Sequence, residues 1–161
     1  MKVAEVLRQR SVLGRFGVDF VSVRHEGEWQ HNAIEINLRK GGTTHPFMTL
    51  QFLTDGTFDQ ETGLYRTPTG QPRFYYASDN LKSPDYEGLL PQDLIDIAVH
   101  RKLHFHTTSQ QGVVFHLIGA LSEFGKLGVV CVAETADHAQ QLYQQAIDVL
   151  DRETGALSEA S

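Results

Sequence analysis

The residue types best suited to catalysis or metal binding are concentrated in one short segment, residues 34–39. Alternate side chains of a β-strand point to opposite faces. An extended conformation would therefore direct the apolar residues of this segment into a core and place Glu35, Asn37 and Arg39 together on the other face. Polar residues on one face are also typical of an ordinary strand whose outer side is solvated. The segment needs a second observation before it indicates a site.

Asp19 supplies that observation, because it is the only charged residue in the apolar run 16–21. A turn after this run is expected to fold the two strands into a hairpin that brings Asp19 opposite Glu35, or one residue away. Facing carboxylates repel each other, so a cation between them is expected. With the amide oxygen of Asn37 they form a set of hard oxygen ligands. Such a set suits Mg²⁺ or Mn²⁺ rather than zinc, and the ion usually shares a phosphate.

Basic side chains and glycines follow the same strand directly. The planar guanidinium of Arg39 could hold a second anion, and Lys40 adds a mobile positive charge. Gly41 and Gly42 could bring backbone N–H groups to the same place, and such groups bind phosphate oxygens. The segment therefore predicts an anion site beside the metal site.

These residues resemble those of ATP-grasp enzymes. That superfamily carries a carboxylate on one strand of a hairpin and a Glu-x-Asn pair on the next, as do residues 17–20 and 35–39 here. The next stretch, residues 38–47, resembles the carboxylate–amine ligases related to the pheganomycin-type peptide ligase, and residues 76–81 and 112–117 add further matches. The resemblance covers nearly the whole chain, as the C-terminal portion of that longer family.

The resemblance implies ATP-dependent formation of an amide bond, through an acyl-phosphate, between a small-molecule carboxylate and an amine or peptide. It implies ATP and Mg²⁺ as cofactors, with Mn²⁺ as a substitute. The implied metal ligands are Asp19, Glu35 and Asn37. The implied catalytic residues, which would contact the acyl-phosphate or the carboxylate, are Arg39 and Lys40. The residues implied to bind the nucleotide are Asn37, Gly41, Gly42 and His45.

The resemblance also divides the chain into two parts. Residues 1–53 would form the C-terminal half of the ATP-grasp core with its metal-binding hairpin, and residues 54–161 a family-specific α/β extension packed with it. In ATP-grasp enzymes the adenine pocket, the lysines that grip the phosphates and the glycine-rich lid precede the hairpin. Here only a short helix is expected before it. We therefore expect part of a ligase that is inactive alone and whose upstream half is supplied in cis or in trans.

The positions of apolar residues, glycines and prolines predict an α/β fold of the α+β type, with an antiparallel, hairpin-based sheet flanked by helices. Strands are expected at residues 16–23, 29–38, 64–67, 73–77, 113–118 and 128–133. Helices are expected at residues 2–11, 47–53, 91–102 and 135–151, so that the chain ends in a helix–strand–strand–helix extension. An irregular stretch, a link and a frayed tail are expected at residues 78–90, 119–127 and 155–161.

Composition limits the classes of function. The chain has 161 residues and a net charge of −6, so it suits one folded domain and is a poor ligand for nucleic acid. No apolar stretch is long enough to span a membrane, and the first residues lack the apolar core of a signal peptide. A cytoplasmic location is the default expectation. Cys131 is the single cysteine, which excludes an intramolecular disulfide, and is expected to be a buried, unreactive thiol.

Two other interpretations remain open. His104, His106 and His116 could together bind zinc, although no cysteine or glutamate accompanies them at ligand spacing. The region after residue 53 carries no cluster that suggests catalysis. The chain could therefore be a non-catalytic α/β module for interaction or oligomerisation, derived from such a ligase, and a homodimer is one form that it could take.

Overall fold

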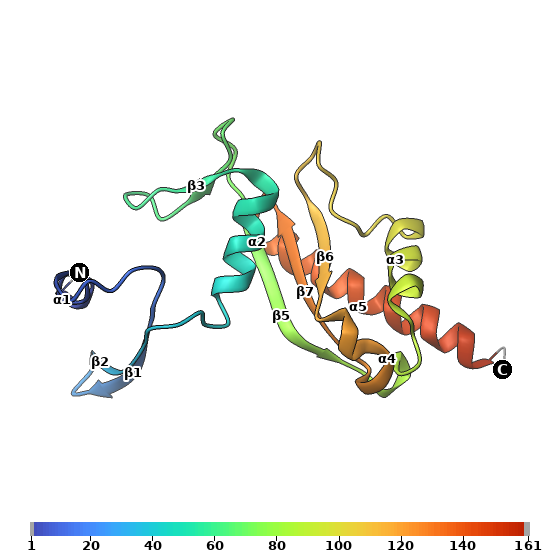
Figure 1. The fold of residues 1–161 in the computed structure, drawn as a ribbon, viewed down its shortest axis with the longest axis horizontal. Coiled ribbons are helices and arrows are strands. Elements are labelled where there is room, and N and C mark those ends of the chain that lie inside the picture. Colours follow the sequence, from blue (N-terminus) through green and yellow to red (C-terminus); the bar gives the residue numbers. More distant parts are fainter. Residues whose placement is uncertain (1, 160–161) are drawn as a thin grey trace. The chain divides into compact units, whose positions relative to one another are not determined.

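Residues 2–159 are described by a computed structural model, which confirms a mixed fold of helices and antiparallel sheets (Figure 1). The chain divides into two compact units, residues 1–45 and residues 46–161. This division is based on contacts between residues, so it does not test where a family-related part of the chain would end. An end of the ATP-grasp part at residue 53 therefore stays a prediction.

The first unit consists of helix α1 (Lys2–Gln9) and a hairpin of strands β1 (Gly17–His25) and β2 (Glu28–Asn37). The strands are joined by Glu26 and Gly27, whose φ angles are 51° and 90°. Positive φ at both positions is typical of the type I′ turn, whose twist matches that of the paired strands. The predicted helix, turn and strands are therefore confirmed.

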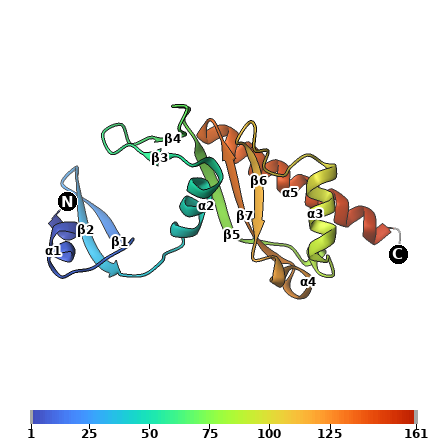
Figure 2. The same cartoon turned by 45° about the horizontal axis from the view of Figure 1, so that its top comes forward.

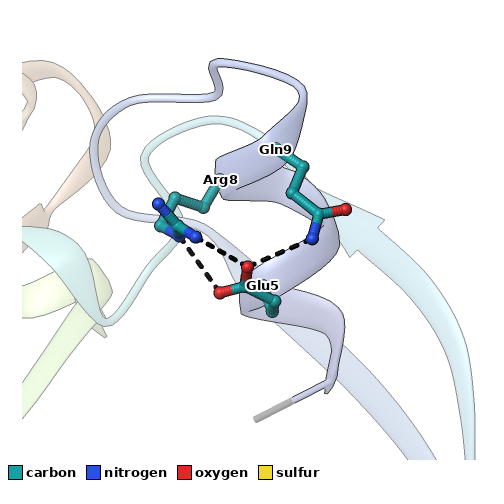
Figure 3. Close-up of polar contacts among 3 residues, drawn as sticks. All are labelled: Glu5, Arg8 and Gln9. Atoms are coloured by element: carbon teal, nitrogen blue, oxygen red, sulfur yellow. Dashed lines mark hydrogen bonds and ion pairs between the residues drawn. The ribbon is translucent and has the colours of Figure 1, made fainter.

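Helix α1 is short, and contacts of Glu5 hold its polar side (Figure 3). The Glu5 carboxylate accepts hydrogen bonds from Arg8 at 2.7 and 3.1 Å and from Gln9 at 3.1 Å. These exposed contacts contribute little stability, because water competes for both charges. On the apolar side, Leu7 and Ile36 line an open hollow of about 250 Å³. Apolar side chains of α1 and β2 therefore face the same hollow.

The second unit is built on a three-stranded antiparallel sheet in the order β5–β7–β6 (Figures 1 and 2). Its strands are β5 (Phe74–Lys82), β6 (Gly112–His116) and β7 (Lys126–Ala133). A separate two-stranded ribbon consists of β3 (Thr57–Phe58) and β4 (Tyr65–Arg66). The helices are α2 (Thr44–Thr54), α3 (Pro91–His100), α4 (Leu121–Phe124) and α5 (Ala136–Glu159), with 3₁₀ turns η1 (Pro84–Tyr86) and η2 (Ile118–Ala120). Within residues 2–159, no helix is long and apolar enough to cross a membrane.

The central strand β7 supports the core on both faces of this sheet, because its side chains alternate between two apolar layers. Val129 and Cys131 pack in the layer that contains residues of α3, α4 and α5. Val130 and Val132 pack on the other side, against Leu50 of α2. All four β7 side chains are fully buried. This explains why the strand is apolar without interruption, as is typical of strands covered on both faces.

Several elements differ from the prediction. Strand β5 continues to Lys82, because pairing with β7 resumes beyond a register shift and covers part of the stretch expected to be irregular. Helix α4 lies within the predicted link and is closed by Gly125 in a left-handed conformation. Helix α5 continues through Gly155 to Glu159, where a frayed tail was expected. The ribbon strand β3 was not predicted. Residues 160–161 of the predicted tail lie outside the described residues.

The apolar residues of the hairpin are the clearest departure from expectation. Ile34, Ile36 and Leu38 were expected to point into a core, but 64%, 46% and 56% of their surfaces are exposed. The first unit is too small to cover them, since α1 is its only helix within the described residues. The prediction of a core on this side of β2 is therefore wrong for the structure of this chain.

Candidate metal and phosphate site

Strand pairing places Asp19 of β1 directly opposite Glu35 of β2. Asn37, two residues further along β2, donates a hydrogen bond from Nδ2 to Oδ2 of Asp19 at 3.2 Å. The residue opposite Asn37 is Gly17, so no β1 side chain lies between the amide and Asp19. The three side chains predicted to bind a metal therefore lie together on one face, at the open end of the hairpin. The expected register is confirmed.

A β-bulge brings the two carboxylates face to face. Pairing is regular from the turn as far as Phe20 and Ala33, and its continuation would place Asp19 opposite Ile34. The register instead shifts by one residue between Asp19 and Phe20. Because side chains alternate along a strand, this shift moves Glu35 from the other face of the hairpin onto the face of Asp19. The bulge is the local feature that assembles the site.

The donor atoms of this trio fit a hard divalent cation. Asp19 and Glu35 are exposed and Asn37 is half-buried, so a phosphate in solution can reach all three. Each side chain offers an oxygen, which is the ligand that Mg²⁺ and Mn²⁺ prefer. Rotation of the Asn37 amide would direct its oxygen toward the same point. Among residues 2–159, no group of three or more His, Cys, Asp or Glu side chains could hold a metal ion. The third ligand of this trio would therefore be the amide oxygen of Asn37.

Arg39 and Lys40 lie just beyond the strand. Strand β2 ends at Asn37, and Arg39 follows in a bend, so strand alternation does not place Arg39 on the face of Glu35 as expected. Its Nη1 donates a hydrogen bond of 3.4 Å to the main-chain carbonyl of Lys40. Both side chains are exposed. The two positive charges therefore lie a few residues after Glu35 along the chain, in a segment not fixed by strand pairing.

The glycine-containing loop leads directly into helix α2. The N–H of Gly41 donates to Oγ1 of Thr44 at 3.1 Å, and the N–H of Thr44 donates to the Gly41 carbonyl at 3.0 Å. The Gly41 N–H is therefore already engaged in the turn. A Cβ atom at Gly41 or at Gly42 would meet no other atom within 4 Å, so the space around the loop is open. His45 lies exposed in the first turn of α2.

The other face of the hairpin carries large exposed apolar side chains, a feature that the sequence interpretation missed. Strand pairing places Phe20, Trp29 and Ile36 on the face opposite to Asp19. Phe20 and Trp29 expose 58% and 61% of their surfaces. Large exposed apolar side chains of this kind often belong to an interaction surface. A two-stranded hairpin alone is also only marginally stable. The alternation of apolar residues was the available signal, but it was assigned to a core.

The three histidines considered for zinc do not form a metal site. His104 and His106 lie on a segment beside β6, with isolated bridges to Val113 and Gln111. The ring of His116 instead lies against Gly128, where a Cβ atom would clash with it. All three residues belong to the described part of the chain, in which no metal-binding group of this kind occurs. The zinc interpretation is therefore wrong.

Cys131 is also excluded as a nucleophile. The side chain is fully buried in the core of the second unit, and burial raises the pKa of the thiol to about 12. The reactive form of cysteine is the thiolate, which this environment disfavours at neutral pH. The prediction of a buried, unreactive thiol is confirmed.

Comparison with known proteins shows that most of the chain is similar in sequence to a ligase. The family described as PGM1 C-terminal domain matches residues 93–146, which run from α3 into α5. The L-propargylglycine–L-glutamate ligase of Streptantibioticus cattleyicolor is 31% identical over 150 residues, or 92% of this chain. The chain resembles the C-terminal portion of an ATP-grasp carboxylate–amine ligase.

This ligase-like chain spans 30% of the length of the curated relative that it matches. The family match lies wholly in the second unit, whereas the candidate metal site lies in the first. No solved structure matches the chain significantly. The relationship to a ligase therefore rests on sequence, and the site rests on the geometry of the hairpin.

Proposed function

We propose that the chain is the part of an ATP-dependent carboxylate–amine ligase that holds magnesium and the phosphates. The observation that supports this most strongly is the direct opposition of Asp19 and Glu35, joined by the Asn37–Asp19 hydrogen bond. Two facing carboxylates destabilise a strand pair unless a cation lies between them. The name of the relative, a ligase of two amino acids, supports this interpretation of the site. Mg²⁺ commonly binds the phosphates of ATP in such enzymes.

The proposed roles follow the positions of the side chains. Asp19, Glu35 and Asn37 bind Mg²⁺ or Mn²⁺. Arg39 and Lys40 contact the acyl-phosphate or the carboxylate substrate, because their positive charges follow directly on the metal-binding strand. When bound, the metal ion stabilises negative charge on the phosphoryl group that is transferred. The protein's own contribution is positioning and electrostatics.

We further propose that the loop after β2 approaches the nucleotide. Gly42 and Gly41 leave open space in which phosphate oxygens could come close to the main chain. His45 and Asn37 lie at the two ends of this loop and complete the proposed ATP contacts. The substrates are a small carboxylic acid and an amine or peptide, in analogy to the two amino acids in the name of the relative.

The rest of the active site is proposed to come from another ligase segment, in cis or in trans. The chain matches 30% of its relative's length, so much of that ligase has no counterpart here. Phe20 and Trp29 present exposed apolar side chains that such a segment could bury. On this basis the chain alone has little or no ligase activity.

The same exposed apolar side chains also favour a second candidate function, a non-catalytic module for interaction or homodimer formation. This candidate needs the exposed side chains of Phe20 and Trp29 but not the facing carboxylates. It therefore predicts that replacing Glu35 and Asn37 changes neither nucleotide binding nor assembly. The two candidates can thus be separated by one pair of substitutions.

A chimera tests the proposal. The matched region of L-propargylglycine–L-glutamate ligase is replaced by this chain, and binding of Mg²⁺·ATP and amino-acid-dependent release of ADP are measured. Glu35→Ala with Asn37→Ala is expected to lower both ADP release and Mg²⁺-dependent binding by about 100-fold. Gln30→Ala with Asn32→Ala is the matched control, because both lie on the same face of β2 but nearer the turn. Equal nucleotide binding by the two double variants would show that the assignment is wrong.

A further inference from the structure

A hollow of about 260 Å³ lies in the second unit, away from the proposed metal site. It is formed between α2, the β3–β4 ribbon and the start of β5. The lining residues that define its character are five aromatic residues and one arginine: Phe47, Phe58, Tyr65, Arg73, Phe74 and Tyr75. Its volume is somewhat below the range of about 300–1,000 Å³ typical of drug-sized ligands. It therefore suits a ligand of amino-acid size.

The aromatic wall of this hollow is fixed by its neighbours. The Tyr65 hydroxyl lies 3.1 Å from Oγ1 of Thr54, which also donates to the Leu50 carbonyl at 2.7 Å. The Tyr65 ring packs edge-on against Phe47, with ring centroids 5.8 Å apart and planes at 86°. Gly56 allows this arrangement, because a Cβ atom there would lie 2.6 Å from the Tyr65 ring. A wall held in this way is preorganised to bind, which lowers the entropy cost of binding.

Arg73 is the unusual feature of the hollow, because this basic residue is almost fully buried and forms no ion pair with a carboxylate in the described part of the chain. Its relative exposure is 8%, and no ion pair among residues 2–159 includes it. Nε donates to the Gln110 carbonyl at 3.2 Å, Nη1 to the Pro72 carbonyl at 2.8 Å and Nη2 to the Ser109 carbonyl at 2.9 Å. Each nitrogen therefore has one carbonyl acceptor, and a guanidinium with five N–H groups has the capacity to donate two further hydrogen bonds.

We propose that this hollow binds a small carboxylic acid with an aromatic or apolar body. A buried positive charge with no opposite charge beside it is unfavourable, and a carboxylate would supply both the opposite charge and an acceptor for the remaining N–H groups. The five aromatic rings would contact the body of the ligand. No sequence pattern marks this site, because Arg73 is one isolated basic residue and its neighbours come together only in the fold.

The test uses the full chain with hydrocinnamate and its uncharged amide as probes. Titration is followed by calorimetry and by NMR of the isotope-labelled protein. We expect saturable binding of hydrocinnamate, with shifts in Arg73 and the hollow, and binding of the amide that is at least about tenfold weaker. Equal affinity for acid and amide, shifts outside the hollow, or no binding of hydrocinnamate would each overturn the proposal.

Two substitutions locate the binding without relying on Arg73, whose loss could unfold the loop it holds. Phe58→Ala removes a wall residue that is 51% exposed and is expected to weaken hydrocinnamate binding severalfold. Phe52→Ala removes an 88% exposed phenylalanine of α2 outside the lining and is expected to leave binding unchanged. Arg73→Gln should abolish the preference for acid over amide where the variant remains folded. An unchanged affinity in Phe58→Ala would contradict the proposal.

A third probe distinguishes a free carboxylic acid from the C-terminal carboxylate of a peptide. Glycyl-L-phenylalanine carries a similar aromatic carboxylate at the end of a peptide, whereas hydrocinnamate is a free acid. Binding of hydrocinnamate in the hollow supports the proposal, and the tighter of the two probes indicates which source the site prefers. The hairpin takes no part in this experiment, so its result is independent of the proposed magnesium site.

Discussion

Asp19 and Glu35 oppose each other across the hairpin, and this arrangement is costly unless a cation lies between them. Asn37 reduces the cost only partly, through its hydrogen bond to Asp19. A charge pair that destabilises its own strands is easier to explain by ligand binding than by folding. Residues retained for function in this way are expected to lower the stability of the protein without its ligand.

Replacing one of these carboxylates should therefore stabilise the hairpin. In the presence of a chelator, Asp19→Asn is expected to raise the free energy of unfolding by about 0.2–1 kcal/mol, because it removes the repulsion from Glu35. Trp29, the single tryptophan, lies in β2 and reports the urea transition by fluorescence. Glu28→Gln is the control, because that carboxylate faces His25 instead of an acid. A less stable Asp19→Asn variant would contradict the account.

The buried thiol gives a pH dependence of known sign. Burial raises the pKa of Cys131 from 9.0 to about 12, so the unfolded chain loses this proton at lower pH than the folded protein. The stability from the protonated thiol is complete below pH 9 and falls by about 1.4 kcal/mol per pH unit between 9 and 12. Tyr86 adds to this loss above pH 10, because burial and its hydrogen bond to Asp151 raise its pKa as well.

Urea unfolding at pH 9 and at pH 10 measures the contribution of the thiol. Between these values Cys131→Ala should lose distinctly less stability than the natural chain, because it has no thiol to titrate. Far-UV circular dichroism follows the second unit, which contains most of the helix and sheet. Equal losses of stability in both proteins would show that the Cys131 thiol does not govern this pH range.

At the scale of elements, β7 fixes the order of the second unit. Its side chains reach both cores, and its pairing with β6 brings His116 opposite Gly128. The imidazole fills the space that a larger residue at position 128 would need. Pairing in this sheet therefore depends on one small residue facing one ring. Replacing Gly128 by a larger residue should therefore lower the stability of the second unit.

Gly128→Ala is expected to destabilise the second unit by about 1–3 kcal/mol, because the added methyl group overlaps the His116 ring. His116→Ala in the same chain should restore much of the loss, which a double-mutant cycle measures as a coupling between the two positions. Gly119→Ala is the control, since a Cβ atom there would meet nothing within 4 Å. Similar effects of the two glycine substitutions would contradict the proposed packing.

Particular residues show which parts of the fold could be predicted. Glu26 and Gly27 marked the turn, and the turn with the alternating strands predicted that Asp19 would lie near Glu35. The bulge at Ile34 that decides the register is not local information, because it depends on how two strands pair. The aromatic hollow around Arg73 was invisible for the same reason, since its walls come from distant segments. Helix α4 is too short for a periodic pattern.

At the scale of the whole molecule, the chain consists of two units with different degrees of burial. The side chains of β1 and β2 are nearly all exposed, whereas the second unit has two apolar cores on either side of its sheet. Exposed hairpins are only marginally stable, while a sheet covered by helices is stable by itself. The two units are therefore expected to unfold under different conditions.

Two natural probes can test this separation. Trp29 lies in the first unit, and Cys131 is buried in the second. Trp29 fluorescence should change at lower urea concentration than the reaction of Cys131 with a thiol reagent, because the hairpin has few buried contacts to lose. Coincident transitions would indicate one cooperative unit and contradict the expected order of unfolding.

The central claim is that Asp19, Glu35 and Asn37 bind a divalent ion together with phosphate, and paramagnetic broadening tests it most directly. Mn²⁺ with tripolyphosphate is titrated into the isotope-labelled chain, and the loss of amide signals is mapped by NMR. In the natural chain, signals around Asp19, Glu35 and Asn37 are expected to broaden first. The control variant Gln30→Ala with Asn32→Ala should behave in the same way. In Glu35→Ala with Asn37→Ala, these signals should not broaden first. Broadening that is unchanged in the latter variant, or that is confined to the second unit, would contradict it.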